Sequence, residues 1–335
     1  MTTLNKKQIA QFEQDGFLVV ENVLSDTDLQ PVIDEYDVHL DRVAQEMFAA
    51  GKISSTYPDL PFGKRYTAIL GEDTSVFDRL EITLPLENDD FPADATVFCG
   101  KAVFNLLTHP KILDVVESLI GSEIYSNPVQ HIRIKPSIKD VPASIMANSY
   151  VGRTTWHQDM GALMDDAIDT QVLTVWVAIS DAPKEMGCLV AVPGSHKKDE
   201  LTVHCPGKGI TAENFIPSKL LGDVNGVNRP KALPVQRGGI VLLNRYTEHA
   251  ALANTSGKLR WSFDLRYNPI GQPTGRPAFP GFVARSRQNP ASEIDHAQWA
   301  DLWENARQQL VNRTYGKPVF NAERWEKYVD APVCA

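Results

Sequence analysis

Residues 156–159 read Trp-His-Gln-Asp and place an imidazole and a carboxylate two residues apart. Alternate side chains of an extended backbone point to the same side, so His157 and Asp159 are positioned to bind one ion together. A third ligand must come from a distant part of the chain, and His249 is the best candidate. Two histidines and one carboxylate with open coordination positions suit non-haem Fe(II) and oxygen chemistry. This ligand set therefore favours an oxygenase.

The pair by itself is a short pattern, and a solvated His157 paired with Asp159 is the alternative to a metal site. Its surroundings favour the metal. Predicted strands follow the pair, and His249 follows the hydrophobic strand predicted over residues 240–243. The ends of strands from two sheets are thus placed to converge on one ion.

Short β-branched and aromatic runs dominate the middle of the chain. They predict strands over the following ranges: residues 129–135, 171–179, 187–192, 240–243 and 259–267. Strands do not alternate with helices in this region, so the pattern favours an antiparallel double sheet over a doubly wound α/β fold. We expect a mainly β protein with flanking α-helices.

Helical patterns flank the strands on both sides. Capping residues and helical spacing predict helices that begin at Asn5, Ser25 and Pro110, and a further helix over residues 299–310. We expect His109, next to Pro110, to start a helix rather than bind a metal. A short buried strand is expected over residues 17–20. The expected organisation is a single domain over residues 1–335, divided as follows: a helical cover to about 125, a β core over about 126–268 and a C-terminal extension with a helix over about 269–335.

Composition sets outer limits on function. The 335 residues are 43% hydrophobic and 22% charged, which is ordinary for a globular protein. A net charge of −9 argues against a nucleic-acid partner, because such proteins carry basic patches. No apolar run is long enough to span a bilayer, so no membrane partner is expected either. The charge says almost nothing about small substrates, and a small-molecule substrate is the partner that we expect.

The four cysteines are scattered, with no Cys-x-x-Cys pair. This spacing suggests neither a disulfide framework nor a zinc knuckle. We therefore expect reduced thiols and a cytoplasmic protein. His204 and Cys205 are adjacent but lie in an irregular stretch, so we expect both at the surface.

The strand predicted last carries charges on one face. Residues 260–267 alternate, with Arg260, Ser262, Asp264 and Arg266 on one side and large apolar residues on the other. The apolar side requires burial, which leaves the polar side in solvent or in a polar interior where a ligand compensates the charges. A planar guanidinium is suited to binding a carboxylate with two hydrogen bonds.

Several motifs together resemble the phytanoyl-CoA dioxygenase family of Fe(II)/2-oxoglutarate-dependent oxygenases. The resemblance runs from about residue 5 to residue 268 and rests on the following: the Asp-Gly-Phe-Leu-Val-Val opening at 15–20, the WHQD motif, Trp176, residues 187–197, His249 and Arg260. It implies a double-stranded β-helix, the cupin-like jelly roll, with flanking helices. It also implies an enzyme that oxidises, and most often hydroxylates, an unactivated C–H bond of a small molecule and releases succinate and carbon dioxide.

Residue by residue, the resemblance matches His157, Asp159 and His249 to the family's iron ligands. Arg260 matches the arginine that binds the distal carboxylate of the cosubstrate 2-oxoglutarate, while dioxygen is the second cosubstrate. Trp176 falls near a family aromatic beside 2-oxoglutarate.

The chain departs from the family pattern at one position. The family often has serine two residues after the second histidine, where this chain has Ala251, and Ser262 is a candidate to supply that hydrogen bond. Relatives that halogenate their substrate replace the metal carboxylate by a small residue. Asp159 therefore favours hydroxylation or another oxidation.

Other polar residues are candidates for substrate contact. Gln130 and His131 precede a long loop over about 137–155 that is a candidate lid. Asp264 and Arg266 are candidates too, although an internal ion pair between them is an equal alternative. His196 belongs to a turn that it is expected to shape, and residues 205–234 are expected to form a surface excursion.

Two rival hypotheses use the same fold. One is a metal-dependent jelly-roll enzyme without a 2-oxo acid, such as a hydrolase or isomerase. The other is a non-catalytic ligand-binding protein with an inactive site. The complete set of His157, Asp159, His249 and Arg260 speaks against the second rival. Neither the substrate nor the oligomeric state follows from the sequence.

Overall fold

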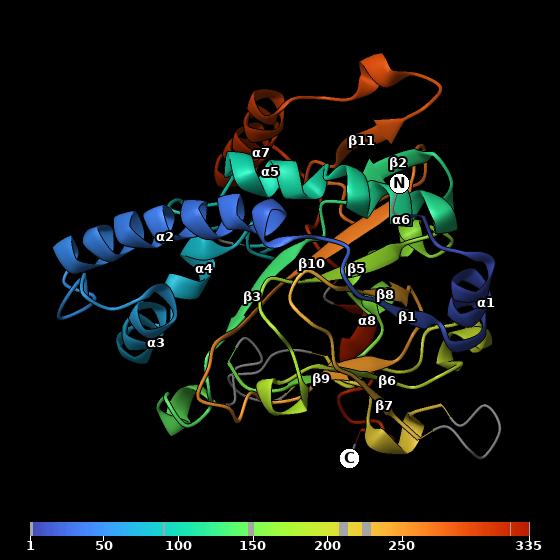
Figure 1. Ribbon diagram of the computed structural model, residues 1–335, viewed down its shortest axis with the longest axis horizontal. Helices are drawn as coiled ribbons and strands as arrows, with labels where there is room; N and C mark the ends of the chain where they lie inside the picture. Colours follow the sequence, from blue (N-terminus) through green and yellow to red (C-terminus); the bar gives the residue numbers. More distant parts are fainter. Residues whose placement is uncertain are drawn as a thin grey trace.

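The computed structural model describes residues 3–89, 91–146, 151–207, 214–222, 229–321 and 323–334. Two sheets form its centre, and α-helices cover one side of the larger sheet (Figure 1). The candidate lid over 137–155 includes residues 147–150, and the expected excursion over 205–234 includes residues 208–213 and 223–228; these three segments lie outside the described residues.

The larger sheet has the strand order β1-β8-β5-β10-β2-β11, and β3 lies beside β2 along the same edge of β10. All of its pairings are antiparallel. Its strands are β1 (Phe17–Val20), β2 (Glu123–Ser126), β3 (His131–Lys135), β5 (Leu173–Ala178), β8 (Ile240–Asn244), β10 (Arg260–Pro269) and β11 (Phe282–Ser286). Two of these strands, β1 and β11, lie outside the range of about 126–268 that we expected for the core.

The smaller sheet has the strand order β4-β9-β6-β7, again with antiparallel pairs. Its strands are β4 (Thr154–His157), β6 (Leu189–Ala191), β7 (Lys231–Leu233) and β9 (His249–Ala251). Together the sheets give the expected mainly β fold, an antiparallel jelly roll with flanking helices. Sequence analysis predicted β6 from its apolar run but missed β4, β7 and β9, as it missed β2 and β11 in the larger sheet. Strands this short show little of a period of two.

The helices fall at both ends of the chain. They are α1 (Lys6–Asp15), α2 (Asp26–Ala49), α3 (Phe62–Glu72), α4 (Val76–Leu80), α5 (Lys101–Leu107), α6 (Pro110–Ile120), α7 (His296–Val311) and α8 (Glu323–Glu326). The side chains of Asn5 and Ser25 cap α1 and α2 in capping boxes, and His109 caps α6. The predicted helix starts are thus confirmed. No helix among the described residues is long and apolar enough to cross a membrane.

The two faces of β10 set the layers of the molecule. Trp261, Phe263, Leu265 and Tyr267 are buried in the core between the larger sheet and the helices. Tyr36 of α2 packs edge-on against Trp261, at 5.4 Å between ring centroids. The opposite face of β10 therefore points toward the smaller sheet, which places its charged residues between the sheets.

A disulfide joins Cys205 to Cys334, whereas Cys99 and Cys188 are free. The expectation of four reduced thiols is therefore wrong. The two partners are 129 residues apart, and such a pairing leaves no local spacing pattern in the sequence. Disulfides are typical of oxidising environments, so the cysteines no longer support the expected cytoplasmic location.

Candidate metal centre

His157, Asp159 and His249 meet between the two sheets. Their ligand atoms all lie within 4.8 Å of one another, and they form the only such group of three or more found in the described part of the chain. The smaller sheet brings them together: His157 ends β4, His249 begins β9, and these residues are register partners in the antiparallel pair. Asp159 follows at the start of a short 3₁₀ turn.

Each histidine is oriented by a backbone carbonyl. Nδ1 of His157 donates to the carbonyl oxygen of Thr155 at 2.8 Å, and Nδ1 of His249 donates to that of Thr247 at 3.0 Å. This arrangement turns the Nε2 atoms toward Asp159 Oδ1, at 3.8 Å for His157 and 3.9 Å for His249. A carbonyl that holds the far nitrogen of a metal-binding histidine is typical of such sites.

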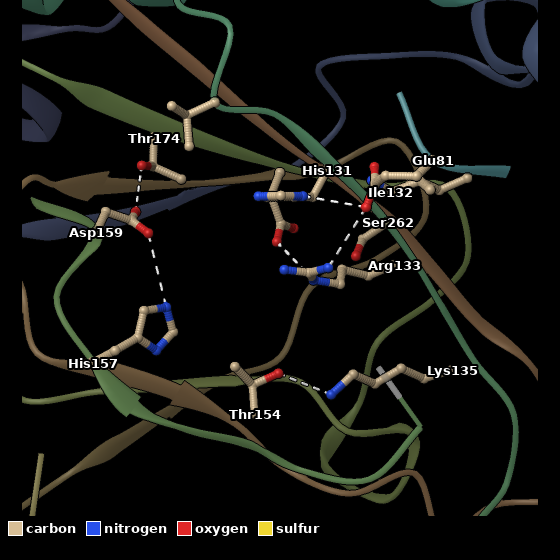
Figure 2. A network of polar contacts seen from close by, with 12 residues as sticks. Glu81, His131, Ile132, Arg133, Lys135, Thr154, His157, Asp159, Thr174 and Ser262 are labelled. Atoms are coloured by element: carbon tan, nitrogen blue, oxygen red, sulfur yellow. Dashed lines mark hydrogen bonds and ion pairs between the residues drawn. The ribbon is translucent and has the colours of Figure 1, made fainter. Parts of the chain in front are cut away.

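The carboxylate of Asp159 is buried and held by two side chains. Arg266 Nη2 donates to Oδ1 at 2.5 Å, and the Thr174 hydroxyl donates to Oδ2 at 2.5 Å, as Figure 2 shows for Thr174. Burial by itself would raise the pKa of Asp159, but Arg266, the two histidines and Thr174 hold it well below its usual range. Asp159 is consequently ionised at neutral pH.

Burial lowers the pKa of His249 to about 4, and the neighbouring His157 adds to this effect. His249 is therefore neutral at physiological pH, as a metal ligand must be. An anionic carboxylate beside a neutral imidazole is a donor set suited to a divalent metal ion.

A small cavity of about 40 Å³ lies next to the cluster. Six of the ten side chains that we expected in the site line it, namely His157, Trp176, His249, Arg260, Asp264 and Arg266. The described lining also includes Ala251, the position where the family often has serine. It is completed by side chains that sequence analysis did not single out, namely Arg133, Thr154, Thr174, Leu189, Leu243 and Ala250.

Arg260 is 1% exposed and is oriented toward this cavity from the start of β10. Its guanidinium lies 5.4 Å from the ring centre of Trp176, and Nη1 is 3.4 Å from the Ser262 hydroxyl. Its Nε has no hydrogen-bond partner among the described residues. Burial lowers the pKa of Arg260 to about 10, so the group stays cationic at neutral pH. A buried cation with an unused donor fits an anionic ligand.

Asp264 and Arg266 do not pair with one another. Arg266 binds Asp159, and Asp264 lies 3.4 Å from Nε of Arg133, which also approaches Glu81 (Figure 2). The alternative of an internal Asp264–Arg266 ion pair is therefore wrong. Both residues line the cavity, but each already has a partner of opposite charge.

Gln130 and His131 do not line this cavity. Nε2 of Gln130 donates to the Ser126 hydroxyl, while Nδ1 of His131 lies 3.2 Å from a carboxylate oxygen of Glu81. The contact of Gln130 and His131 with a substrate stays a prediction.

Two of the missed side chains had a signal in the sequence. Thr174 is a polar residue inside an apolar strand, two positions from Trp176 and hence on the same face. Arg133 alternates with Ile132 and Ile134, which places it opposite Ser262 on β10.

His204 is buried, so the expectation that it lies at the surface is wrong. The residue is 2% exposed, and its Nε2 accepts a hydrogen bond from the backbone N–H of Gln158 at 3.0 Å. Gln158 lies between two members of the cluster, so His204 supports the metal site. Cys205 is buried too, because its disulfide and backbone pairing with Phe215 hold it inside. His196, as expected, shapes a turn: its Nε2 bonds the carbonyl of Glu13.

A larger cavity of about 320 Å³ lies along the smaller sheet. Thr154, Ala250 and Ala251 line both cavities, whereas Trp156 and Val190 line only the larger one. Trp156 and Val190 alternate along their strands with His157 and Ala191. Strand alternation turns these two sets to opposite faces. We therefore assign the metal chemistry to the smaller cavity.

The chain is similar to known proteins over most of its length. A family model described as phytanoyl-CoA dioxygenase (PhyH) matches residues 12–262. The phytanoyl-CoA dioxygenase domain-containing protein 1 homolog of Caenorhabditis elegans is 25% identical over 268 residues, which cover 76% of this chain and 88% of the relative.

Two solved structures share the fold. A non-heme monooxygenase, ThoJ in its apo form, is 18% identical with a TM-score of 0.54, and the match covers 92% of this chain and 99% of that one. The non-heme alpha-ketoglutarate-dependent carbocyclase SnoK from nogalamycin biosynthesis is 17% identical with a TM-score of 0.50, covering 87% and 94%.

Proposed function

Because this chain belongs to the phytanoyl-CoA dioxygenase family of Fe(II)/2-oxoglutarate-dependent oxygenases, we propose that it hydroxylates an unactivated C–H bond of a small molecule. The reaction releases succinate and carbon dioxide from 2-oxoglutarate. The observation that carries this proposal is the convergence of His157, Asp159 and His249 within 4.8 Å, with both Nε2 atoms directed at the carboxylate.

Nε2 of His157, a carboxylate oxygen of Asp159 and Nε2 of His249 would hold Fe(II). These three protein ligands would leave coordination positions open for the cosubstrates. Bound iron would supply the activation of dioxygen that couples C–H oxidation to decarboxylation. Asp159 supplies the carboxylate ligand that halogenating relatives lack, and this favours hydroxylation over halogenation.

Arg260 would bind the distal carboxylate of 2-oxoglutarate. The guanidinium is buried beside Trp176, and its Nε donor is unused in the described structure, as a site for a carboxylate requires. Ser262 lies next to Nη1 of Arg260, and its hydroxyl would supply the hydrogen bond to the cosubstrate that Ala251 cannot make. Trp176, Leu189 and Leu243 give the cavity apolar walls that exclude water.

A substrate screen that measures succinate tests the proposal. Wild-type protein with Fe(II) and 2-oxoglutarate should form succinate in amounts that rise when a true substrate is added, and His157→Ala should abolish this activity. His296→Ala is a matched control, because this histidine bonds the carbonyl of Cys99 on the helical side of the molecule and should leave turnover unchanged.

The same screen separates the rivals. Turnover without oxygen and without 2-oxoglutarate would favour a metal-dependent jelly-roll enzyme of another class. A folded protein that binds neither Fe(II) nor 2-oxoglutarate would favour a non-catalytic protein.

A further inference from the structure

The C-terminal segment, residues 323–334, lies against the turn that carries Asp159. Arg324 Nη1 donates to the carbonyl oxygens of Met160 at 3.2 Å and Gly161 at 3.4 Å. Trp325 Nε1 donates to the same Gly161 carbonyl at 3.1 Å. Helix α8 therefore binds the backbone carbonyls of Met160 and Gly161, the two residues that follow Asp159.

His204 binds the same turn from the other end. Its Nε2 accepts the N–H of Gln158, and its Nδ1 donates to the carbonyl oxygen of Thr202, which fixes the ring in one tautomer. The ring lies 4.7 Å from the Trp325 ring, between centroids. A Cβ atom at Gly161 would lie 2.8 Å from His204 Nε2, so the turn, the histidine and the tryptophan are closely packed.

The disulfide closes this arrangement. Cys205 follows His204 directly, and its partner Cys334 lies near the end of the segment that contains Arg324 and Trp325. Further contacts keep the segment in place: Arg324 pairs with Asp165, and Lys219 Nζ donates to the carbonyl of Pro332 at 3.3 Å. The segment lies outside residues 12–262, which the family model covers.

We propose that residues 323–334 are a positioning element of the metal site and that the Cys205–Cys334 disulfide makes this element redox-dependent. Arg324, Trp325 and His204 fix the backbone of residues 158–161 and thereby the direction of the Asp159 carboxylate. The inference rests on the proposed metal role of Asp159. Partners that orient metal ligands typically contribute 10- to 100-fold to metal affinity.

Reduction by a dithiol would release the element. The dithiol attacks one disulfide sulfur and then closes to its own cyclic disulfide, so that two electrons and two protons pass to Cys205 and Cys334, which become thiols. The segment then keeps only its noncovalent contacts, and its effective concentration at the turn falls. Weaker metal binding is the consequence.

Titration with Co(II) under anaerobic conditions tests this, with the visible ligand-field absorption of the bound ion as readout. Protein reduced with dithiothreitol and then freed of reagent, like Cys334→Ser, should bind Co(II) about 10-fold more weakly than the oxidised wild type. Cys99→Ser leaves the disulfide intact, so its oxidised form should bind Co(II) with wild-type affinity and its reduced form should bind as weakly as the reduced wild type. Equal affinity of oxidised and reduced wild type would overturn the redox dependence.

A second pair of variants tests positioning without removing the disulfide. Trp325→Phe keeps the ring against His204 but removes the hydrogen bond to Gly161, and Arg324→Ala removes the other donors. Both should weaken Co(II) binding and shift its absorption spectrum, and Arg324→Lys should restore part of the affinity. Arg307→Ala, which loses only a pair with Glu304 on α7, should bind Co(II) like the wild type.

The outcomes separate this inference from the proposed function. If these variants are less stable but bind Co(II) with the affinity and spectrum of the wild type, residues 323–334 are only a structural brace. A wild-type protein that binds no Co(II) at all would overturn the metal role of Asp159 itself.

Discussion

Replacement of Arg260 by methionine should affect stability and cosubstrate binding in opposite directions. The guanidinium is 1% exposed, its Nε has no partner among the described residues, and its contact with Ser262 is long, at 3.4 Å. Burying a charge without full pairing costs free energy, and an apolar side chain of similar length avoids that cost. The cosubstrate-free Arg260→Met protein should therefore melt at the wild-type temperature or above it.

Binding of 2-oxoglutarate should fall sharply in the same variant. Removal of one partner of a buried charged hydrogen bond typically costs about 2–5 kcal/mol, and even the lower limit corresponds to roughly a 30-fold rise in Kd. At a concentration of 100 times the wild-type Kd, 2-oxoglutarate should stabilise the wild type by about 2.7 kcal/mol but Arg260→Met by only about 0.9 kcal/mol.

Anaerobic calorimetric titration gives Kd, and thermal unfolding with and without 2-oxoglutarate gives the stabilisation. Arg65→Met is the control, because Arg65 is buried and paired with Asp41 in the helical layer, away from the cavity. This variant should lose stability yet keep the full response to 2-oxoglutarate. An Arg260→Met protein that retains the wild-type Kd would refute the assignment of this guanidinium to the distal carboxylate.

Three further predictions follow from the contacts of the site. Thr174→Val, which loses one hydrogen bond to Asp159, should weaken Co(II) binding about 10-fold, and Thr174→Ser should restore it; an unchanged Kd by titration would show that Arg266 alone is sufficient. Burial lowers the pKa of His204 to about 3, below its usual value near 6.5, so below pH 6.5 the unfolded chain binds a proton here that the folded chain does not. The contribution of this residue to stability is fully present above pH 6.5 and is lost as pH falls toward 3, by up to about 1.4 kcal/mol per pH unit. Urea unfolding at several pH values measures this loss: between pH 6.5 and 3 the unfolding free energy of His204→Asn should change with pH less steeply than that of the wild type, by about 1.4 kcal/mol per pH unit. Chelation of the metal should abolish succinate formation and lower the melting temperature, and full recovery on adding Fe(II) would show that the fold survives without metal; activity that persists in chelator would contradict the metal site.

Local patterns in the sequence were enough to predict the parts of the fold that depend on neighbouring residues. The capping boxes at Asn5 and Ser25, and the alternation over residues 260–267, each report a local conformation, and each is found as expected. The convergence of His157, Asp159 and His249 was predictable because His157 and Asp159 are two residues apart on an extended backbone and His249 follows a predicted strand.

The features that were missed depend on contacts between distant segments. Nothing near Cys205 in the sequence identifies Cys334 as its partner, and nothing near His204 indicates that the ring will bond Gln158 and pack on Trp325. The sequence placed Arg266 on a face that lies either in solvent or in a polar interior, and it did not identify Asp159 as its partner. The choice between Asp264 and Asp159 depends on how the turn after β4 folds back onto β10. Periodicity gives the face of a strand and not the identity of the group opposite it.

The charges around the cavity explain why the site has the form expected for a metal and a dianion. Arg266 neutralises Asp159 before any metal is bound, and Asp264 does the same for Arg133, so these four charges largely cancel in pairs. Of the three arginines that line the cavity, Arg133, Arg260 and Arg266, only Arg260 has no carboxylate within ion-pair distance among the described residues. Divalent iron would add two further positive charges beside it. A ligand with two carboxylates balances this excess, one at the metal and one at Arg260, whereas a neutral cosubstrate would leave the guanidinium buried and unpaired at a cost in free energy. The electrostatics of the cavity therefore favour a dicarboxylate over a neutral molecule, independently of any likeness to other proteins.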